Sequence, residues 1–319
     1  MKDVEKGFII QFLYSLSSGV IALVLPLIMR DRGVSLVSIG LIYSALPLLF
    51  QLMRIFFAVL SDQVGRKKFF SLSGAAGALT SAIYWFSRVP AHFLAGKIVE
   101  SASVASIWAV NRPYVLEKGG SRKELTKLRA IASISKAFGS AIAGYLYALA
   151  SHVGALTFCI ISYSVIPVIS TTISEEKKGK IGLSKAFSEL DFRSKSRVFK
   201  EFMSSFFIFG LSIGLASDYA LTLFLREAGL KSFEIGVALG LNTVLQGILM
   251  VWTSSLKVEA LLSVGGVFSC IILVSTGFLS GWKAGAIIVA LGASRGLIHS
   301  CLEGILAGIS SKESLGGDI

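Results

Sequence analysis

The sequence predicts an all-α membrane protein, a polytopic bundle of about 10 transmembrane helices. Over 319 residues, 54% of the side chains are hydrophobic and 16% are charged, and the mean hydropathy is +0.74. Apolar runs of about 20 residues, enough to cross a hydrocarbon core about 30 Å thick, recur along the whole chain. Basic residues gather in alternate segments between these runs, as they do in chains that cross a bilayer repeatedly.

The helices follow from the apolar runs in order. The first run comes after Lys2 and Lys6, but it is longer than the roughly 7–15 apolar residues of a signal peptide. Arg30 also stands where cleavage would need a small residue, so we expect a retained first helix. The expected helices span residues 7–30, 35–60, 69–88, 89–112, 127–150, 153–173, 199–226, 232–256, 259–280 and 284–309.

The net charge of +12 is explained by topology and does not indicate nucleic-acid binding. Basic clusters at 66–68, 118–129 and 177–200 fall on one side of the expected helices, and the loops on the other side carry few basic residues. Lys and Arg accumulate in cytoplasmic loops. We therefore expect both termini in the cytoplasm and a multi-pass protein in the plasma or inner membrane.

The reactive residues of the sequence indicate no enzyme, metal site or cofactor. Three cysteines lie in apolar runs without ligand spacing, and three histidines are scattered. The Ser-x-x-Lys match at 133–136 lies within an expected helix and lacks companion motifs, so we interpret it as chance. These residues are Cys159, Cys270, Cys301, His92, His152 and His299.

A short charged turn between the second and third apolar runs carries a recognisable pattern. It resembles the loop between helices 2 and 3 of the major facilitator superfamily, and the matching residues are Leu60, Ser61, Asp62, Gly65, Arg66 and Lys67. Ala58 and Gln63 depart from the family pattern, which has Gly and a basic residue there. The resemblance implies two six-helix halves, secondary transport by alternating access, and a role for Asp62, Gly65, Arg66 and Lys67 as a conformational-switch loop.

An internal repeat supports two related halves. Residues 25–33 align with 221–229, and Ile39-Gly40 aligns with Ile235-Gly236 at the same offset. We therefore expect a six-helix bundle over 1–173, a cytoplasmic linker over 174–200 and an incomplete four-helix bundle over 201–319. Within the linker, Leu183, Phe187, Leu190 and Phe192 fit either an amphipathic surface helix or a solvated connection.

The same offset places the counterpart of the fifth helix beyond Ile319, so helices 11 and 12 of the family's twelve are expected to be missing. A fragment, a remnant and a functional short form would all look like this. A homodimer can cover the faces that the missing helices leave. A non-transporting remnant or membrane scaffold is therefore the alternative to a transporter.

Charged residues inside a bilayer are costly and are candidates for function. Lys97 and Glu100 lie three residues apart in the fourth expected helix, with Asn111 on the same face. The pair can exchange a proton during transport, or it can simply hold helices together, and both interpretations stay open. Glu100 is the first candidate for the proton carrier, with Lys97 as its partner.

A second set of polar residues lies in the C-terminal half. Arg295, His299 and Glu303 follow one another every four residues and can relay protons or only hydrogen-bond to one another. With the pair of the fourth helix, they complete a predicted proton and substrate pathway that also includes Asp218, Asn242 and Gln246. Counting Arg54 and Lys136, intramembrane cations exceed acids by one, which hints at an anionic substrate.

The fifth expected helix bears on the direction of transport. Residues 139–144 keep the outer glycines of the Gly-Pro-x-x-Gly-Gly ending that the family's exporters carry, but they lack its proline. Gly-x-x-x-Gly pairs such as Gly292 and Gly296 predict close helix packing. The expected function is proton-coupled movement of a small organic solute, with efflux mildly favoured.

Overall fold

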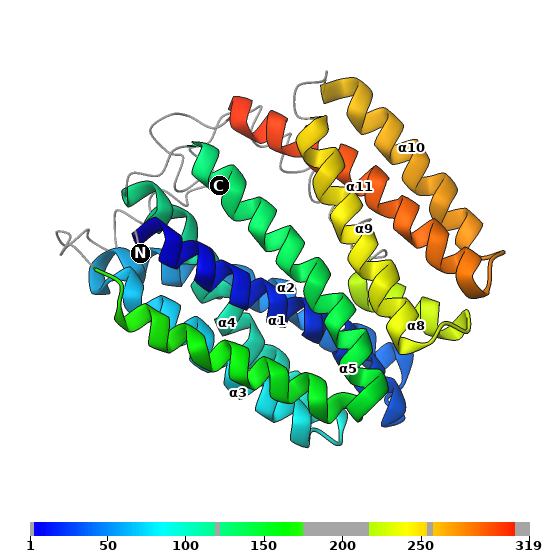
Figure 1. Cartoon of the computed structure of the whole chain (residues 1–319), viewed down its shortest axis with the longest axis horizontal. Coiled ribbons are helices and arrows are strands. Elements are labelled where there is room, and N and C mark those ends of the chain that lie inside the picture. Colours follow the sequence, from blue (N-terminus) through cyan, green and yellow to red (C-terminus); the bar gives the residue numbers. More distant parts are fainter. Residues whose placement is uncertain (1–2, 119–121, 175–216, 254–257, 310–319) are drawn as a thin grey trace. The chain divides into compact units, whose positions relative to one another are not determined.

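The computed structural model describes residues 3–118, 122–174, 217–253 and 258–309, and every regular element in these ranges is a helix (Figure 1). The helices are α1 (Asp3–Asp31), α2 (Leu36–Val64), α3 (Arg66–Phe86), α4 (Pro90–Glu117), α5 (Arg122–Thr171), α8 (Asp218–Glu227), α9 (Ser232–Trp252), α10 (Val258–Thr276) and α11 (Gly281–Ile309). Within the described residues, seven helices are long and apolar enough to cross a membrane. The all-α membrane bundle is confirmed, and the expected number of ten spanning helices is not confirmed.

Helix α5 contains a break where the sequence placed the end of one helix and the start of the next. Ala150 (φ −132°, ψ 20°) and Ser151 (φ 53°, ψ −156°) leave the helical region inside a 50-residue element. Helix α8 covers the end of the expected 199–226 helix. The rest of that helix and the linker residues Leu183, Phe187, Leu190 and Phe192 lie outside the described residues.

The described chain divides into two compact units. The first contains α1–α5 and the first turns of α9 (Ser232–Gly240), and the second contains α8, the remainder of α9, α10 and α11. In the first unit α1 and α3 pack against α5, and α2 and α3 pack against α4. Helix α1 is the most enclosed of the apolar helices. In its most apolar 18-residue stretch 78% of the residues are buried, against 12% in the corresponding stretch of α2.

Glycine lets α1 and α5 approach each other closely. A Cβ added to Gly19 would collide with the backbone carbonyl of Lys136, and one added to Gly139 would collide with the carbonyl of Leu16. The Cβ added to Gly139 would also lie 3.2 Å from the Cα of Gly19. In a membrane, where van der Waals packing drives helix association, such backbone contact substitutes for a hydrophobic driving force.

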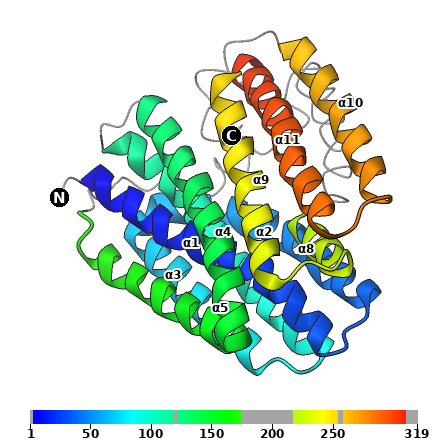
Figure 2. The same ribbon diagram turned by 45° about the vertical axis from the view of Figure 1, so that its right-hand side comes forward.

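In the second unit, glycines allow α9 and α11 to pack closely in the same way. A Cβ on Gly296 would lie 2.6 Å from the carbonyl oxygen of Gln246, and one on Gly292 would collide with the carbonyl of Asn242. The predicted packing role of this Gly-x-x-x-Gly pair is therefore confirmed. Helix α10 runs beside α11 in the same unit (Figure 2).

A single arginine ties the α1–α2 connection to the end of α3. Arg32 donates to the carbonyl oxygens of Tyr84 (3.2 Å), Trp85 (3.1 Å) and Ser87, and its Nη2 lies 3.1 Å from Nε2 of His152. A cation at a helix C-terminus complements the unpaired carbonyls there. Burial lowers the pKa of Arg32, but a guanidinium is so basic that it keeps its charge.

Candidate transport pathway and conformational-switch loop

The α2–α3 loop turns at Gly65, whose φ of 97° is a conformation that favours glycine. Its N–H donates to the carbonyl of Ser61 (3.0 Å) and closes α2. The next residue, Arg66, starts α3 and turns its side chain back over the loop. The sequence pattern around Asp62, Gly65, Arg66 and Lys67 thus corresponds to a tight turn that can hold charged side chains in fixed positions.

Arg66 joins two acids. Its Nη2 lies 2.8 Å from Oδ1 of Asp62, and its Nε donates to both carboxylate oxygens of Glu117 at 3.0 Å. Lys67 donates to the carbonyl of Thr171 at the end of α5 (2.6 Å). Sequence reasoning missed Glu117, although an acid at the end of the fourth helix was a usable signal. The loop is therefore fastened to α4 and α5 within the first unit.

We expect Arg66→Gln to destabilise the first unit by about 2 kcal/mol, because two carboxylates would lose their shared guanidinium donor. The Arg66 side chain is only 10% exposed, so water replaces little of that interaction. Thermal unfolding of the purified full chain measures the effect, and Lys68→Gln is the control, since Lys68 lies in the same first turn of α3 and is exposed. Equal unfolding temperatures for both variants would contradict this role of Arg66.

Lys97 and Glu100 form the most buried ion pair of the predicted pathway. Nζ of Lys97 lies 2.8 Å from Oε2 of Glu100, and the side chains are 2% and 16% exposed. The ammonium also lies 4.1 Å from the centre of the Tyr43 ring, and the Tyr84 hydroxyl donates to Oε2 of Glu100 at 2.5 Å. Helices α2, α3 and α4 each contribute to this cluster, so sequence spacing found the pair but not its two tyrosines.

Glycines position the Tyr84 hydroxyl. Gly96 of α4 lies against the ring of Tyr84, since an added Cβ would fall 2.7 Å from Cδ1, and Gly77 of α3 makes the same kind of contact with Tyr163. Tyr163 packs edge-on against Tyr14 of α1, with ring centres 5.9 Å apart. Close contact with Gly96 therefore fixes the buried ring whose hydroxyl donates to Glu100, and Tyr163 is likewise held between α3 and α1.

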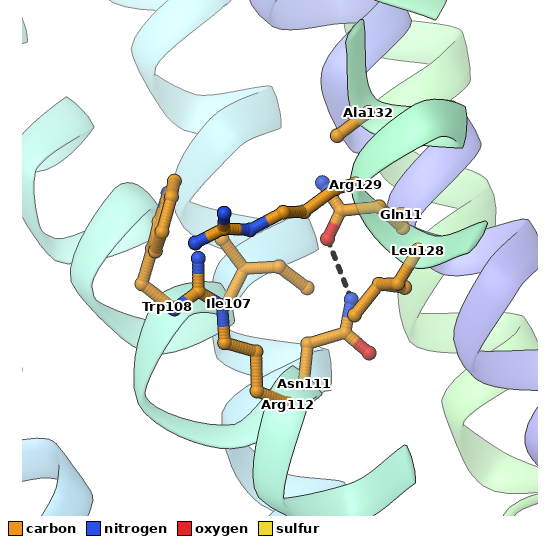
Figure 3. Close-up of a pocket in the computed structure, with 8 residues that line it drawn as sticks. All are labelled: Gln11, Ile107, Trp108, Asn111, Arg112, Leu128, Arg129 and Ala132. Atoms are coloured by element: carbon orange, nitrogen blue, oxygen red, sulfur yellow. Dashed lines mark hydrogen bonds between the residues drawn. The ribbon is translucent and has the colours of Figure 1, made fainter. Parts of the chain in front are cut away.

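Asn111 lies further along the same face of α4, near the Glu117 end. Its amide donates to the side-chain carbonyl of Gln11 on α1 (2.6 Å), and both residues line a hollow of about 50 Å³ (Figure 3). The other lining residues come from α4 and α5, and they are Ile107, Trp108, Arg112, Leu128, Arg129 and Ala132. Asn111 is thus separate from the Lys97–Glu100 cluster and belongs to this second place.

In the second unit, Arg295 of α11 contacts two of the predicted residues. It lies 3.6 Å from Oδ1 of Asp218 on α8 and 3.5 Å from Oδ1 of Asn242 on α9. Asn242 in turn donates to the carbonyl of Ile288 (2.6 Å). The structure therefore joins Asp218, Asn242 and Arg295, which the sequence analysis had placed on three separate helices.

The remaining predicted residues of this unit are Gln246, His299 and Glu303. The side chain of Gln246 is half-buried, and His299 lies one turn beyond Arg295 and is also half-buried. The side chain of Glu303 lies outside the described residues, so the predicted Arg295–His299–Glu303 relay stays a prediction. Among the described residues, no group of three His, Cys, Asp or Glu side chains is placed to hold a metal ion.

The fold resembles solved transporter structures. The nucleoside transporter NupG matches with a TM-score of 0.79 and 12% identity over 100% of this chain and 85% of its own. A bacterial homologue of the human lysosomal transporter Spinster, inward-facing and unoccupied, gives 0.71 and 13%, covering 99% of this chain and 77% of its own. For the human organic anion transporter MFSD10 (TETRAN) the values are 0.63 and 17%, with 99% and 88% covered.

At these identities the structural matches establish the fold and nothing about the solute. No curated protein sequence matches this chain at a significant level. The sequence model of the Major Facilitator Superfamily matches residues 7–316, nearly the whole chain. The chain therefore belongs to the Major Facilitator Superfamily and is a multi-pass membrane transporter, not an enzyme.

Proposed function

We propose that this transporter moves a small organic solute by proton-coupled secondary transport, with Glu100 as the proton carrier and Lys97 as its partner. The observation that carries the proposal is the Lys97–Glu100 pair, which is buried within the first unit and bonded to Tyr84. A buried pair costs desolvation energy that its mutual attraction only partly offsets. Ionisable residues kept inside a membrane bundle despite that cost are commonly part of a proton or substrate path.

The contacts also suggest how proton binding to Glu100 changes the partners of Lys97. When Glu100 is charged, it is held by the Lys97 ammonium (2.8 Å) and by the Tyr84 hydroxyl (2.5 Å). Protonation of Glu100 removes the charge that holds Lys97, whose ammonium then has only the Tyr43 ring beside it among these contacts. The change of partners couples proton binding to a rearrangement of α2, α3 and α4.

Glu100→Gln is expected to abolish gradient-driven transport while leaving passive exchange of the solute. The amide keeps the shape of the side chain and an oxygen that can accept from Tyr84, but it carries no titratable proton and no charge to pair with Lys97. The measurement is uptake and efflux of a solute panel in vesicles containing the purified full chain, with and without an imposed pH gradient. Glu227→Gln, an exposed acid at the end of α8, is the control and is expected to behave like the wild type.

Gradient dependence that survives in Glu100→Gln would remove this carboxyl from the coupling step. No movement of any solute by the folded wild-type chain would favour the alternative of a membrane scaffold. Comparing loaded and unloaded vesicles also tests direction, for which we propose efflux on the pattern of Gly139 and Gly144.

We also propose that both termini face the cytoplasm in the plasma or inner membrane, on the basic excess at 66–68 and 118–129. A membrane-impermeant thiol reagent applied to intact cells tests it: a cysteine at exposed Arg88 should react, and one at exposed Lys68 should not. A homodimer stays a prediction, which light scattering of the purified chain in detergent tests directly.

A further inference from the structure

Positive charge is concentrated at the Glu117 end of α4, in a place that the proposed coupling step does not use. Arg54 of α2, Arg112 of α4 and Arg129 of α5 come from three helices, yet Arg112 lies near enough for its charge to act on both other arginines. Fifteen residues separate Arg112 from Lys97, which is about 22 Å along α4. This arginine cluster is therefore a second charged place, separate from the Lys97–Glu100 pair along α4.

Two arginines of the cluster, Arg112 and Arg129, line an open space. The guanidinium groups of Arg112 and Arg129 point toward one another beside the indole of Trp108 (Figure 3). The Arg112 guanidinium lies 5.0 Å from the centre of that ring, and the ring packs edge-on against Phe50. Stacking on an aromatic face fixes the plane of a guanidinium and leaves its N–H edge available to a ligand.

The size of the space limits what can enter it. A hollow of about 50 Å³ holds a few water molecules or one small polar group, not a whole organic solute. Two guanidinium groups turned to one point repel each other in a medium of low dielectric constant, and an anion between them replaces that repulsion with attraction. Paired N–H donors match the two oxygens of a carboxylate or phosphate.

We propose that Arg112 and Arg129, with Arg54 adding charge, form a binding station for an oxyanion: the carboxylate or phosphate group of the transported solute. The inference rests on the proposed transport function, since it assigns the group to the solute that the protein moves. The solute enters or leaves through this station, with the Gln11–Asn111 amide pair beside it, and meets the Lys97–Glu100 pair further along α4.

Binding can be tested without transport. Inorganic phosphate and succinate are titrated against the purified full chain in neutral detergent at constant ionic strength, and dissociation constants are taken from the shift in unfolding temperature. We expect Arg112→Gln and Arg129→Gln each to weaken binding at least about tenfold, and Arg112→Lys to weaken it less, because Lys keeps the charge but not the fork. Arg88→Gln, exposed at the opposite end of α4, is the matched control.

An anionic lipid headgroup carries the same chemistry, so a second arm separates the two sources. The chain is placed in nanodiscs of phosphatidylcholine with or without phosphatidylglycerol. Stabilisation by phosphatidylglycerol alone, lost in Arg112→Gln, would support the oxyanion site and overturn its assignment to a solute. No response to phosphate, succinate or phosphatidylglycerol would overturn the site itself, as would unchanged binding in both glutamine variants.

The two proposals fail in different ways. Anion binding that depends on Arg112 in a chain that transports nothing would refute the proposed function and leave the site standing. If the wild-type chain shows proton-driven transport and the Arg112→Gln and Arg129→Gln variants bind anions normally, the oxyanion site is refuted and the proposed function stands. Elution of each variant as a single species in size-exclusion chromatography shows that it is folded before either comparison is made.

Discussion

Gly139→Leu is expected to prevent stable packing of α1 on α5. The Cβ alone would collide with the carbonyl oxygen of Leu16 and would lie 3.2 Å from the Cα of Gly19. Both neighbours are backbone atoms of a buried helix, so they cannot move aside as a flexible side chain would. The two helices must therefore move apart along their whole contact, and we expect the free energy of unfolding to fall by about 3 kcal/mol or more.

The unfolding temperature of the purified full chain reports this loss, with an expected decrease on the order of 10 °C. Gly40→Leu is the control: Gly40 also lies inside an apolar helix, but a Cβ added there meets nothing within 4 Å. Equal decreases for the two variants would mean that a leucine side chain in an apolar helix, and not the α1–α5 contact, explains the effect. A Gly139→Leu chain as stable as the wild type would refute the close packing.

Hydrophobicity and turn residues predicted the positions of the helices well, because both depend on residues that are close together in the sequence. The starts of α2 and α4 fall within a few residues of expectation, since Ser35 caps one and Pro90 begins the other. The break in α5 at Ser151 was likewise expected between two helices. Apolar length alone does not show which helix lies inside, however: 78% of the most apolar stretch of α1 is buried and only 12% of that of α2, although both are strongly apolar.

The candidate site was predicted only where its partners are close in sequence. Lys97 and Glu100 share a helix face, so spacing identified them. Tyr84 reaches Glu100 from α3 and Glu117 reaches Arg66 from α4, and a single sequence does not show which residues of different helices meet. Arg295 likewise contacts Asp218 on α8 and Asn242 on α9, and its spacing in the sequence did not indicate these contacts.

Lys97→Met is expected to destabilise the first unit by about 3–5 kcal/mol, because it leaves the Glu100 carboxylate buried with its ammonium partner removed. Methionine has a similar length and fills the same space beside the Tyr43 ring, so little packing is lost. The double variant Lys97→Met with Glu100→Gln is expected to regain most of that stability, since neither charge remains. Unfolding temperatures of the four chains complete a double-mutant cycle.

The cycle separates the two roles that the spacing of the pair leaves open. If Lys97 and Glu100 only hold α2, α3 and α4 together, the double variant is stable and still transports solute with an unchanged response to a pH gradient. If Glu100 carries the coupled proton, the double variant is equally stable but the gradient no longer drives transport. The unfolding temperature reports the pair as a structural contact, and the response to a pH gradient reports it as a proton carrier. A double variant that regains stability but is no longer driven by the gradient would therefore show that the pair acts in proton coupling.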